Sequence, residues 1–234
     1  MALPKINTPT YELELPSTGE IIKYRPFLVK EQKLLLMAQE TGNEEDIANV
    51  MGDLVESCSF GKCNSKTAPI FDVEYLFLKI RGKSVGDVVN LSITCPDDNK
   101  TKVPVKLNID DISVNMLDEH SNEILLMDNI KIIFRYPILS DMKGMTVGQT
   151  ASGVFSVMNS CVQEIHYGDD IYTRADITDK DVEDFIDQLT GAQFEKITDF
   201  FNSMPKLRHI IPVTNPKTKK KGEVVLEGLQ SFLV

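Results

Sequence analysis

The amino-acid sequence predicts an α+β protein in which helical and strand patterns fill different stretches of the chain. Apolar residues recur with the helical period of about 3.6 in residues 25–86 and again in 178–204, whereas residues 87–136 alternate with the strand period of about two. The predicted order is an N-terminal β-hairpin plus a three-helix segment, central antiparallel β-hairpins, and a C-terminal αα-hairpin followed by a β-hairpin.

The changes of pattern also indicate how the 234 residues are divided. We expect an N-terminal hairpin and helical core in residues 1–86, an antiparallel β region in 87–137, and a C-terminal α+β region with the terminal β-hairpin in 138–234. A chain of this length suits one large domain or two small ones, so the alternative is that the last region is continuous with residues 1–137. Residues 137–148, rich in Ser, Asp, Lys and Gly, are the best candidate for a linker.

The first pattern along the chain is that of a β-hairpin. Residues 11–15 alternate as YELEL and residues 20–24 answer as EIIKY, with the turn-forming sequence PSTG between them. Pro26 has no backbone N–H to donate and is predicted to end the second strand. Two strands therefore precede the first helix.

Three helical patterns follow and are predicted to form the core. Residues 30–41 close on Gly42, a residue suited to the left-handed conformation that ends a helix. Asn43 can cap a second helix, whose apolar residues recur at helical spacing: Ile47, Val50, Met51, Leu54, Val55 and Cys58. Residues 71–80 are apolar around most of a helical circumference, which is typical of a helix buried on several sides. We expect the strand-rich remainder of the chain to pack against these helices.

Strand patterns dominate the middle of the chain. The predicted strands are Val89–Cys95, Lys102–Leu107, Ile112–Met116, Glu123–Met127 and Ile130–Tyr136. Pro96–Lys100 is predicted to form the first turn, and the pair Asp128-Asn129 is predicted to form a two-residue hairpin turn. This region should therefore be antiparallel sheet.

Helices return in the C-terminal part, where a helix is predicted over residues 154–163 and a hairpin over 164–172. Thr178 can cap the next helix, whose apolar stripe consists of Val182, Phe185, Ile186 and Leu189. A last helix runs from Phe194 to Met204 and stops at Pro205, so the two form an αα-hairpin. The final predicted strands are Leu207–Val213 and Glu223–Leu226.

Two of the predicted hairpins repeat one outline. Ile93-Thr94-Cys95-Pro96 and Val213-Thr214-Asn215-Pro216 are each followed by a polar tip and a second strand. Zinc-ribbon hairpins share this outline and carry cysteines at their tips, but here only Cys95 occupies such a position. We interpret both hairpins as metal-free, and convergent turn chemistry explains the repeat about as well as duplication does.

The four cysteines do not form the ligand pattern of a structural zinc site. Such a site uses two close pairs of ligands, and only Cys58 and Cys63 are close in the sequence, while Cys95 and Cys161 stand alone. We therefore expect no metal or other cofactor, and we expect reduced, mostly buried thiols. A zinc-ribbon-like binding module is kept as a second alternative.

Composition excludes several classes of function. The net charge of −10 and the isoelectric point near 4.8 argue against a nucleic-acid binder, because such proteins neutralise phosphates. No run approaches about 18 consecutive apolar residues, so no membrane span is expected, and the first residues lack the pattern of a signal peptide. The sequence contains no Gly-rich phosphate loop, H-E-x-x-H or G-x-S-x-G motif, and the pairs Asp97-Asp98 and Asp169-Asp170 suit turns. We expect a protein that is not an enzyme and binds no small-molecule substrate.

The candidate partner-binding residues lie near the C-terminus. They are the basic run Lys217, Lys219, Lys220 and Lys221 and the apolar residues Leu229, Phe232 and Leu233. A solvated hairpin tip is the simplest interpretation of the lysines, docking on an acidic partner surface is the main alternative, and nucleic acid comes third. The apolar residues are expected either to fold onto the protein's own core or to insert into a neighbour.

Several stretches resemble one family of phage proteins. The order PF–VKE–LL–MA, the capped amphipathic helix, and DVEYLFLKIRGKSVGD look like the small baseplate hub proteins of T-even-type contractile-tailed phages. The later stretches ITCPDDNKTKVPVKL and NPKTKKKGEVVLEGLQSF fit the same family, so the resemblance runs nearly end to end. These motifs are structural and carry no catalytic residues.

The resemblance implies a function in tail assembly. It implies a structural subunit of the baseplate hub that acts through contacts with other hub and wedge proteins, in the virion tail after assembly in the host cytoplasm. It also implies that no cofactor is needed. The alternative within the same family is an assembly factor, or chaperone, that helps to build the hub and leaves.

Overall fold

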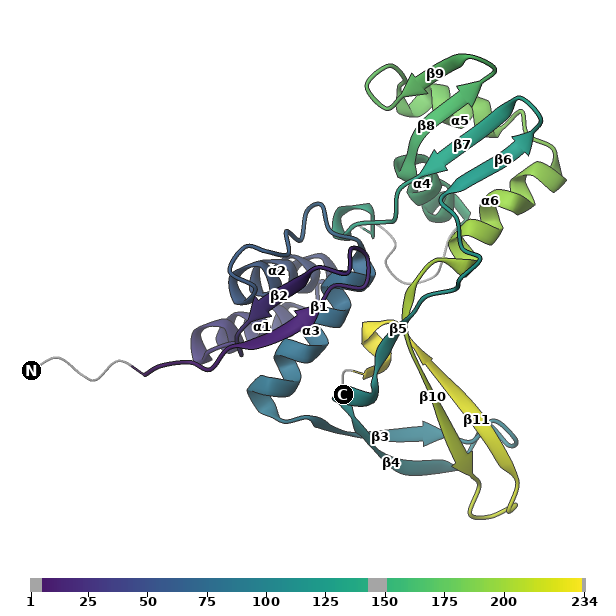
Figure 1. The fold of residues 1–234 in the computed structure, drawn as a ribbon. Coiled ribbons are helices and arrows are strands. Elements are labelled where there is room, and N and C mark those ends of the chain that lie inside the picture. The colour runs from purple at the N-terminus through teal and green to yellow at the C-terminus, as the bar shows by residue number, and fades with distance from the viewer. Residues whose placement is uncertain (1–5, 143–150, 233–234) are drawn as a thin grey trace, which may run out of the picture. The chain divides into compact units, whose positions relative to one another are not determined.

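The computed structural model describes residues 6–142 and 151–232 and confirms an α+β fold (Figure 1). Internal contacts divide the chain into two compact units. Unit 1 comprises Met1–Asn115 together with Lys206–Val234, and unit 2 comprises Met116–Pro205. The predicted boundaries at residues 86 and 137 mark changes of element type along the sequence, and they stay a prediction.

Unit 1 contains the N-terminal hairpin, the three helices and two further hairpins. Its elements are β1 (Tyr11–Glu14), β2 (Ile21–Tyr24), α1 (Val29–Thr41), α2 (Glu44–Cys58), α3 (Ile70–Val85), β3 (Val88–Thr94), β4 (Lys102–Asn108), the 3-10 turn η1 (Ile109–Asp111), β5 (Ser113–Asn115), β10 (Lys206–Thr214), β11 (Lys221–Glu227) and the 3-10 turn η3 (Leu229–Phe232). Strands β1 and β2 pair with each other, and so do β3 and β4, whereas β5 joins the β10–β11 hairpin in the order β11-β10-β5. The hairpins were predicted, but the long-range pairing of β5 with β10 was not.

Local signals in the sequence place the ends of the helices. Gly42 follows α1 with a φ of 66°, in the left-handed region where glycine is favoured. The side chain of Asn43 accepts a hydrogen bond of 2.9 Å from the backbone N–H of Glu45 and so caps α2. Gly86 follows the last residue of α3. The predicted helix boundaries are therefore confirmed to within a few residues.

Helix α3 is the central buried element of unit 1. Its buried apolar side chains lie on several sides of the helix: Phe71, Val73, Leu76, Phe77, Leu78 and Ile80. Removing such side chains from water stabilises the fold by about 1.5–3 kcal/mol each. The prediction of a helix buried on several sides is confirmed.

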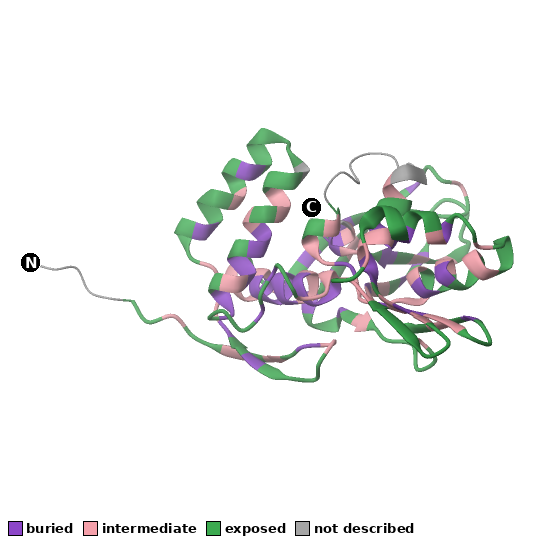
Figure 2. Cartoon of the chain, turned by 90° about the horizontal axis from the view of Figure 1, so that it is seen from above, coloured by how far each residue is buried: buried purple, intermediate pink, exposed green. Residues whose placement is uncertain are grey.

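Helix α1 is much more exposed than its sequence suggested. Figure 2 shows much of the surface of the α1–α2 pair in the colour of exposed residues, and Leu34, Leu36 and Met37 are each more than half exposed. Consecutive residues point about 100° apart around a helix, so an unbroken run of apolar residues cannot all face one core. Within α1 only Glu31 and Ala38 are buried.

The described residues of unit 2 form a four-stranded antiparallel sheet with three helices. Its elements are β6 (Glu123–Met127), β7 (Ile130–Phe134), the 3-10 turn η2 (Leu139–Met142), α4 (Ala151–Cys161), β8 (Val162–Tyr167), β9 (Asp170–Thr173), α5 (Asp179–Ile186) and α6 (Gly191–Ser203). The strand order is β6-β7-β8-β9, and β6 and β7 are joined at Asp128-Asn129 as predicted. Helix α4 was predicted over residues 154–163, but it ends at Cys161 because Val162 already pairs with Phe134 of β7.

Unit 2 has a hydrophobic core of its own. Sheet and helices both contribute buried side chains to it, among them Ile132, Phe134, Cys161, Val182, Ile197 and Phe200. Residues 116–205 therefore form a compact unit of their own, and the expectation that the strand-rich remainder packs against the three N-terminal helices stays a prediction for them. The candidate linker at 137–148 is described only as far as Met142, and the rest of it lies outside the described residues.

Candidate functional site

The predicted basic residues form the loop of the β10–β11 hairpin. Lys217, Lys219 and Lys220 lie between the strands, Lys221 begins β11, and all four are exposed. We call residues 217–221 the lysine loop. It is a concentration of positive charge in a chain whose net charge is −10, and it is therefore suited to meet an acidic surface.

Strand pairing carries the lysine loop away from the rest of its sheet. The two strands pair antiparallel from Arg208 opposite Glu227 to Thr214 opposite Lys221. Strand β5 covers only the first residues of β10, as far as Arg208, so the far part of the hairpin continues beyond it (Figure 1). Lys219 has a φ of 61°, in the left-handed region, and so closes the turn.

Side chains connect this hairpin to the β3–β4 hairpin. The buried Asn215 donates from its Nδ2 to Oδ1 of Asp97 at 2.9 Å and to Oδ2 of Asp98 at 3.0 Å, and the hydroxyl of Thr218 donates to Oδ2 of Asp97. We call Asp97, Asp98, Asn215 and Thr218 the tip cluster. Hydrogen bonds from Thr218 and Asn215 lower the pKa of Asp97, because they stabilise the charged carboxylate.

Sequence reasoning assigned Asp97 and Asp98 to a turn and did not pair them with Asn215. The turn assignment is confirmed for Asp98, whose Oδ1 accepts the backbone N–H groups of Lys100 and Thr101 at 3.0 and 2.9 Å. The repeated hairpin outline was the signal that could have identified the pairing, because it placed the same turn in two hairpins.

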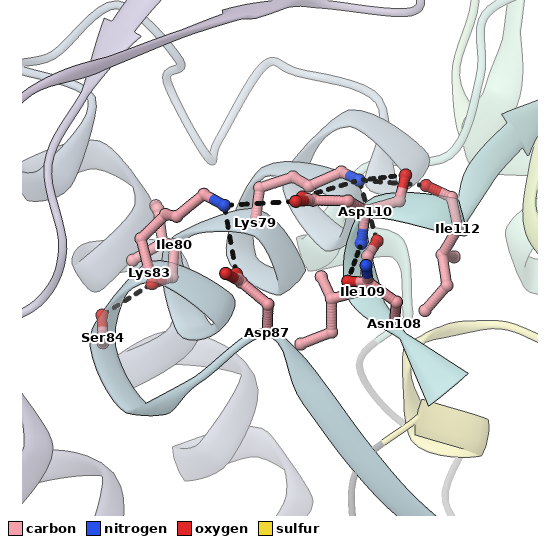
Figure 3. Close-up of polar contacts among 9 residues, drawn as sticks. All are labelled: Lys79, Ile80, Lys83, Ser84, Asp87, Asn108, Ile109, Asp110 and Ile112. Carbon is pink, nitrogen blue, oxygen red and sulfur yellow. Dashed lines mark hydrogen bonds and ion pairs between the residues drawn. The ribbon is translucent and has the colours of Figure 1, made fainter. Parts of the chain in front are cut away.

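At its other end the β3–β4 hairpin is fixed to α3 by a buried lysine (Figure 3). The ammonium of Lys79 donates to the backbone carbonyl oxygens of Ile109 at 2.8 Å, Ile112 at 3.2 Å and Asp110 at 3.3 Å. Burial lowers the pKa of Lys79, since it disfavours the charged form, while the carboxylate of Asp110 acts in the opposite direction. We call this arrangement the root clamp.

A second lysine of α3 completes the root clamp. Lys83 lies 3.1 Å from Oδ1 of Asp87 and 3.3 Å from Oδ2 of Asp110, and the pKa of Lys83 is raised, chiefly by the hydrogen bond to Asp87. The backbone N–H of Ile109 donates to the carbonyl oxygen of Asp87 at 2.7 Å. Sequence reasoning missed Lys79, although a lysine directly after the apolar run Tyr75–Leu78 was a visible signal.

The apolar residues of the C-terminal segment lie inside their own chain. Leu229 is 2% exposed and Phe232 is 0% exposed, and the turn η3 that carries them contacts α3. The backbone N–H of Leu229 donates to Oε1 of Glu74 at 3.4 Å, and burial raises the pKa of Glu74 to about 7. A partner could reach these two side chains only if η3 moved away. Leu233, the third predicted residue, lies outside the described residues.

All four cysteines are buried and unpaired, as predicted. Burial raises the pKa of Cys58 to about 11 and the pKa values of Cys63 and Cys161 to about 12. These thiols therefore stay protonated near neutral pH, and a protonated thiol is a poor nucleophile and metal ligand. In the described part of the chain, no three His, Cys, Asp or Glu side chains are placed to hold a metal ion. No helix among the described residues is long and apolar enough to cross a membrane.

Unit 2 carries a largely apolar hollow of about 310 Å³ on its sheet. Its lining comes from β7, β8, β9, α5 and the segment before α5: Ile130, Ile165, Tyr167, Tyr172, Ile177, Asp181 and Phe185. Tyr167 and Tyr172 are exposed at this surface. Together with the exposed face of α1, the hollow provides apolar surface on which other proteins could pack.

Comparison with known proteins identifies the protein family to which this chain belongs. A family model described as T4 bacteriophage base plate protein matches residues 8–234. The protein therefore belongs to this family of phage base plate proteins, which confirms the resemblance found in the sequence. Over 225 residues it is 24% identical to the baseplate hub assembly protein gp26 of Enterobacteria phage T4, and the alignment covers 95% of this chain and 97% of that protein. No solved structure matches the chain.

Proposed function

We propose that this protein takes part in building the hub of a phage tail baseplate by binding other baseplate proteins. The observation that carries the proposal is the match of residues 8–234 to the base plate protein family. The relative from phage T4 is named a hub assembly protein, and its alignment spans nearly all of both chains. This points to the hub as the part of the baseplate concerned.

The exposed surfaces support a role in protein binding. Leu34, Leu36 and Met37 of α1 are exposed to solvent. Burying such a side chain fully in an interface would stabilise a complex by about 1.5–3 kcal/mol, so this face of α1 is suited to binding a partner. The lysine loop adds a charged patch, and such patches set the rate and orientation of association more than its affinity. The partners that we propose are other hub and wedge proteins of the same tail.

We also propose that the protein acts without catalysing a reaction. The sequence carries no recognisable nucleophile–base motif, and the buried thiols are held in their unreactive form. A turnover of any common substrate that disappears when one polar residue is changed would contradict this. If the proposal holds, binding to other proteins is alone responsible for the protein's effect on assembly.

Two forms of this role lead to different fates for the protein. As a structural subunit, it would stay in the baseplate of the finished virion, which is the form that the sequence resemblance favoured. As an assembly factor, it would act in the host cytoplasm and leave, and the name of the T4 relative favours this second form. Both forms use the same contacts with hub proteins.

Mass spectrometry of purified particles distinguishes the two forms. A structural subunit is expected at a fixed number of copies relative to the other hub proteins, and an assembly factor is expected in infected-cell extracts but not in particles. Infection with a phage that lacks this gene tests the proposal itself. Loss of complete hubs supports it, whereas normal baseplates in normal numbers would contradict both forms.

A further inference from the structure

The turns of the β3–β4 and β10–β11 hairpins have the same construction. Each begins with a buried residue, Cys95 or Asn215, which is 0% or 1% exposed and is followed by proline. Four residues later, the backbone N–H of Asn99 or Lys219 donates to the carbonyl oxygen of that buried residue, at 3.0 and 2.9 Å respectively. Asn99 and Lys219 both adopt a left-handed conformation, with φ values of 51° and 61°.

The correspondence extends to the side chains within the turns. An oxygen of Asp98 and the hydroxyl oxygen of Thr218 each accept the backbone N–H two residues later, at 3.0 and 3.4 Å. Each turn thus provides two matching positions that are separated by two residues. They are Cys95 and Asp98 in one hairpin, and Asn215 and Thr218 in the other.

Two facing turns that each carry a pair of ligands with this spacing are the arrangement of a zinc ribbon. Here three of the four positions carry no thiol. Oδ1 of Asn215 accepts the backbone N–H groups of Lys217 and Thr218 at 2.9 and 3.3 Å, which leaves Nδ2 directed at the carboxylates of Asp97 and Asp98. An amide nitrogen in this orientation donates hydrogen bonds and has no lone pair to offer a metal.

We propose that the two hairpins are a metal-free counterpart of a zinc ribbon, in which the tip cluster stands in place of the metal and holds the hairpins together. The described strands place the hairpins in separate sheets, so the connection between them falls to side chains. The first turn also lies close to strand β11 of the other hairpin, since a Cβ atom added at Gly222 would lie 2.9 Å from Cγ of Pro96. Hydrogen bonds to a charged carboxylate are stronger than those between neutral groups, and so suit this role.

The proposal can be tested by restoring the ligands. The variant Asp98→Cys/Asn215→Cys/Thr218→Cys, with the native Cys95, is expected to bind one Co²⁺ or Zn²⁺ per chain and to give the Co²⁺ absorption spectrum of a tetrahedral thiolate site. Metal should raise its melting temperature, and a chelator should reverse the change. The unchanged protein is expected to bind no stoichiometric zinc.

A matched control tests the geometry. The variant Asp97→Cys/Asn215→Cys/Thr218→Cys carries as many thiols, but its first pair has the wrong spacing, and we expect its affinity for Zn²⁺ to be at least about ten-fold lower. Equal affinities, or a folded first variant that binds no metal, would overturn the proposal.

A second experiment covers the case in which the cysteine variants do not fold. Thr218→Val and Asp97→Ala remove the two ends of one hydrogen bond between the hairpins. Each substitution alone should raise the unfolding equilibrium constant by some factor. If the two residues interact, the double variant should raise it by a factor at least about two-fold smaller than the product of the two single factors. The pair Thr214→Val and Asp97→Ala is the control and should be multiplicative, because Thr214 is exposed on β10. A multiplicative result for Thr218 and Asp97 would show that the cluster does not couple the hairpins.

Discussion

The ammonium of Lys79 lies 2.8 Å from the backbone carbonyl oxygen of Ile109, in a buried position between α3 and the turn after β4. A buried charge is tolerated only where hydrogen bonds replace those lost with water, and Lys79 has carbonyl oxygens around it for this purpose. The same lysine therefore fixes the turn after β4 against α3.

Replacing Lys79 with methionine should destabilise the protein strongly. The carbonyl oxygens of Ile109 and Ile112 would lose the ammonium as a donor, although Ile109 would keep the backbone N–H of Ile112 at 3.2 Å. A hydrogen bond to a charged group contributes about 1.5–3 kcal/mol. We expect a loss of at least about 2 kcal/mol in the free energy of unfolding measured with urea. Lys106→Met, at an exposed position of β4, should change it by less than about 0.5 kcal/mol. Equal effects would mean that the root clamp has no energetic role.

Leu54 and Leu36 test the placement of the core. Leu54 is 3% exposed, so Leu54→Ala should cost about 2–5 kcal/mol, the range for deletion of a buried leucine side chain. Leu36 is 52% exposed, and Leu36→Ala should cost less than about 1 kcal/mol. Thermal and urea unfolding of the two variants give the comparison. A cost below about 1 kcal/mol for Leu54→Ala would show that the core has been placed wrongly.

Glu74 should make stability depend on pH. Its pKa is raised from 4.5 to about 7 by burial, so the folded state holds a proton more tightly than the unfolded state. This contribution is complete below about pH 4.5, is lost as the pH rises through about 7, and amounts to about 3 kcal/mol at most. Glu74→Gln cannot ionise and should remove this part of the pH dependence in unfolding experiments from pH 4 to pH 9. The exposed Glu20→Gln should keep it, and a Glu74→Gln variant with the unchanged profile would refute the assignment.

Substitution of Phe232 tests whether the C-terminal segment packs into the core of its own chain or into a neighbouring protein. Because its side chain is 0% exposed, Phe232→Ala should cost about 3–5 kcal/mol of stability. Val225→Ala, at a position that is 45% exposed, is the control and should cost less than about 1 kcal/mol. Deleting residues 229–234 should also destabilise the fold. A Phe232→Ala protein that keeps its stability but fails to enter hubs would instead place Phe232 in an interface.

The lysine loop should affect the rate of association more than stability. We would change Lys217, Lys220 and Lys221 to serine and Lys219 to asparagine, since a φ of 61° at residue 219 suits asparagine. Binding to partly assembled hubs, purified from cells infected with a phage that lacks this gene, should be slower, most clearly at low salt.

The control for the lysine loop changes as many charges elsewhere in unit 1. Lys62, Lys66, Lys102 and Lys106 are all exposed, and their replacement by serine alters the net charge equally. If the two variants associate equally slowly, the effect comes from net charge, and the lysine loop is not a docking element.

Short-range chemistry in the sequence determined the elements of this protein. Asn43 and Thr178 cap helices, Gly42 ends one, and the residues at Asp128-Asn129 turn a hairpin, as predicted. Each of these features depends on residues a few positions apart, so the sequence pattern contains the whole interaction. Family membership could likewise be inferred, because it rests on the order of such patterns.

Tertiary structure alone decided how the elements combine. Leu207 of β10 pairs with Val114 of β5, Asn215 donates to Asp98 across 117 positions of sequence, and residues 116–205 form a separate unit within the chain. It also decided that Leu36 is exposed and Phe232 buried, although both are large apolar residues. Periodicity shows which face of an element is apolar, but not which distant element covers it. That depends on how the whole chain closes its core, and local patterns do not contain this information.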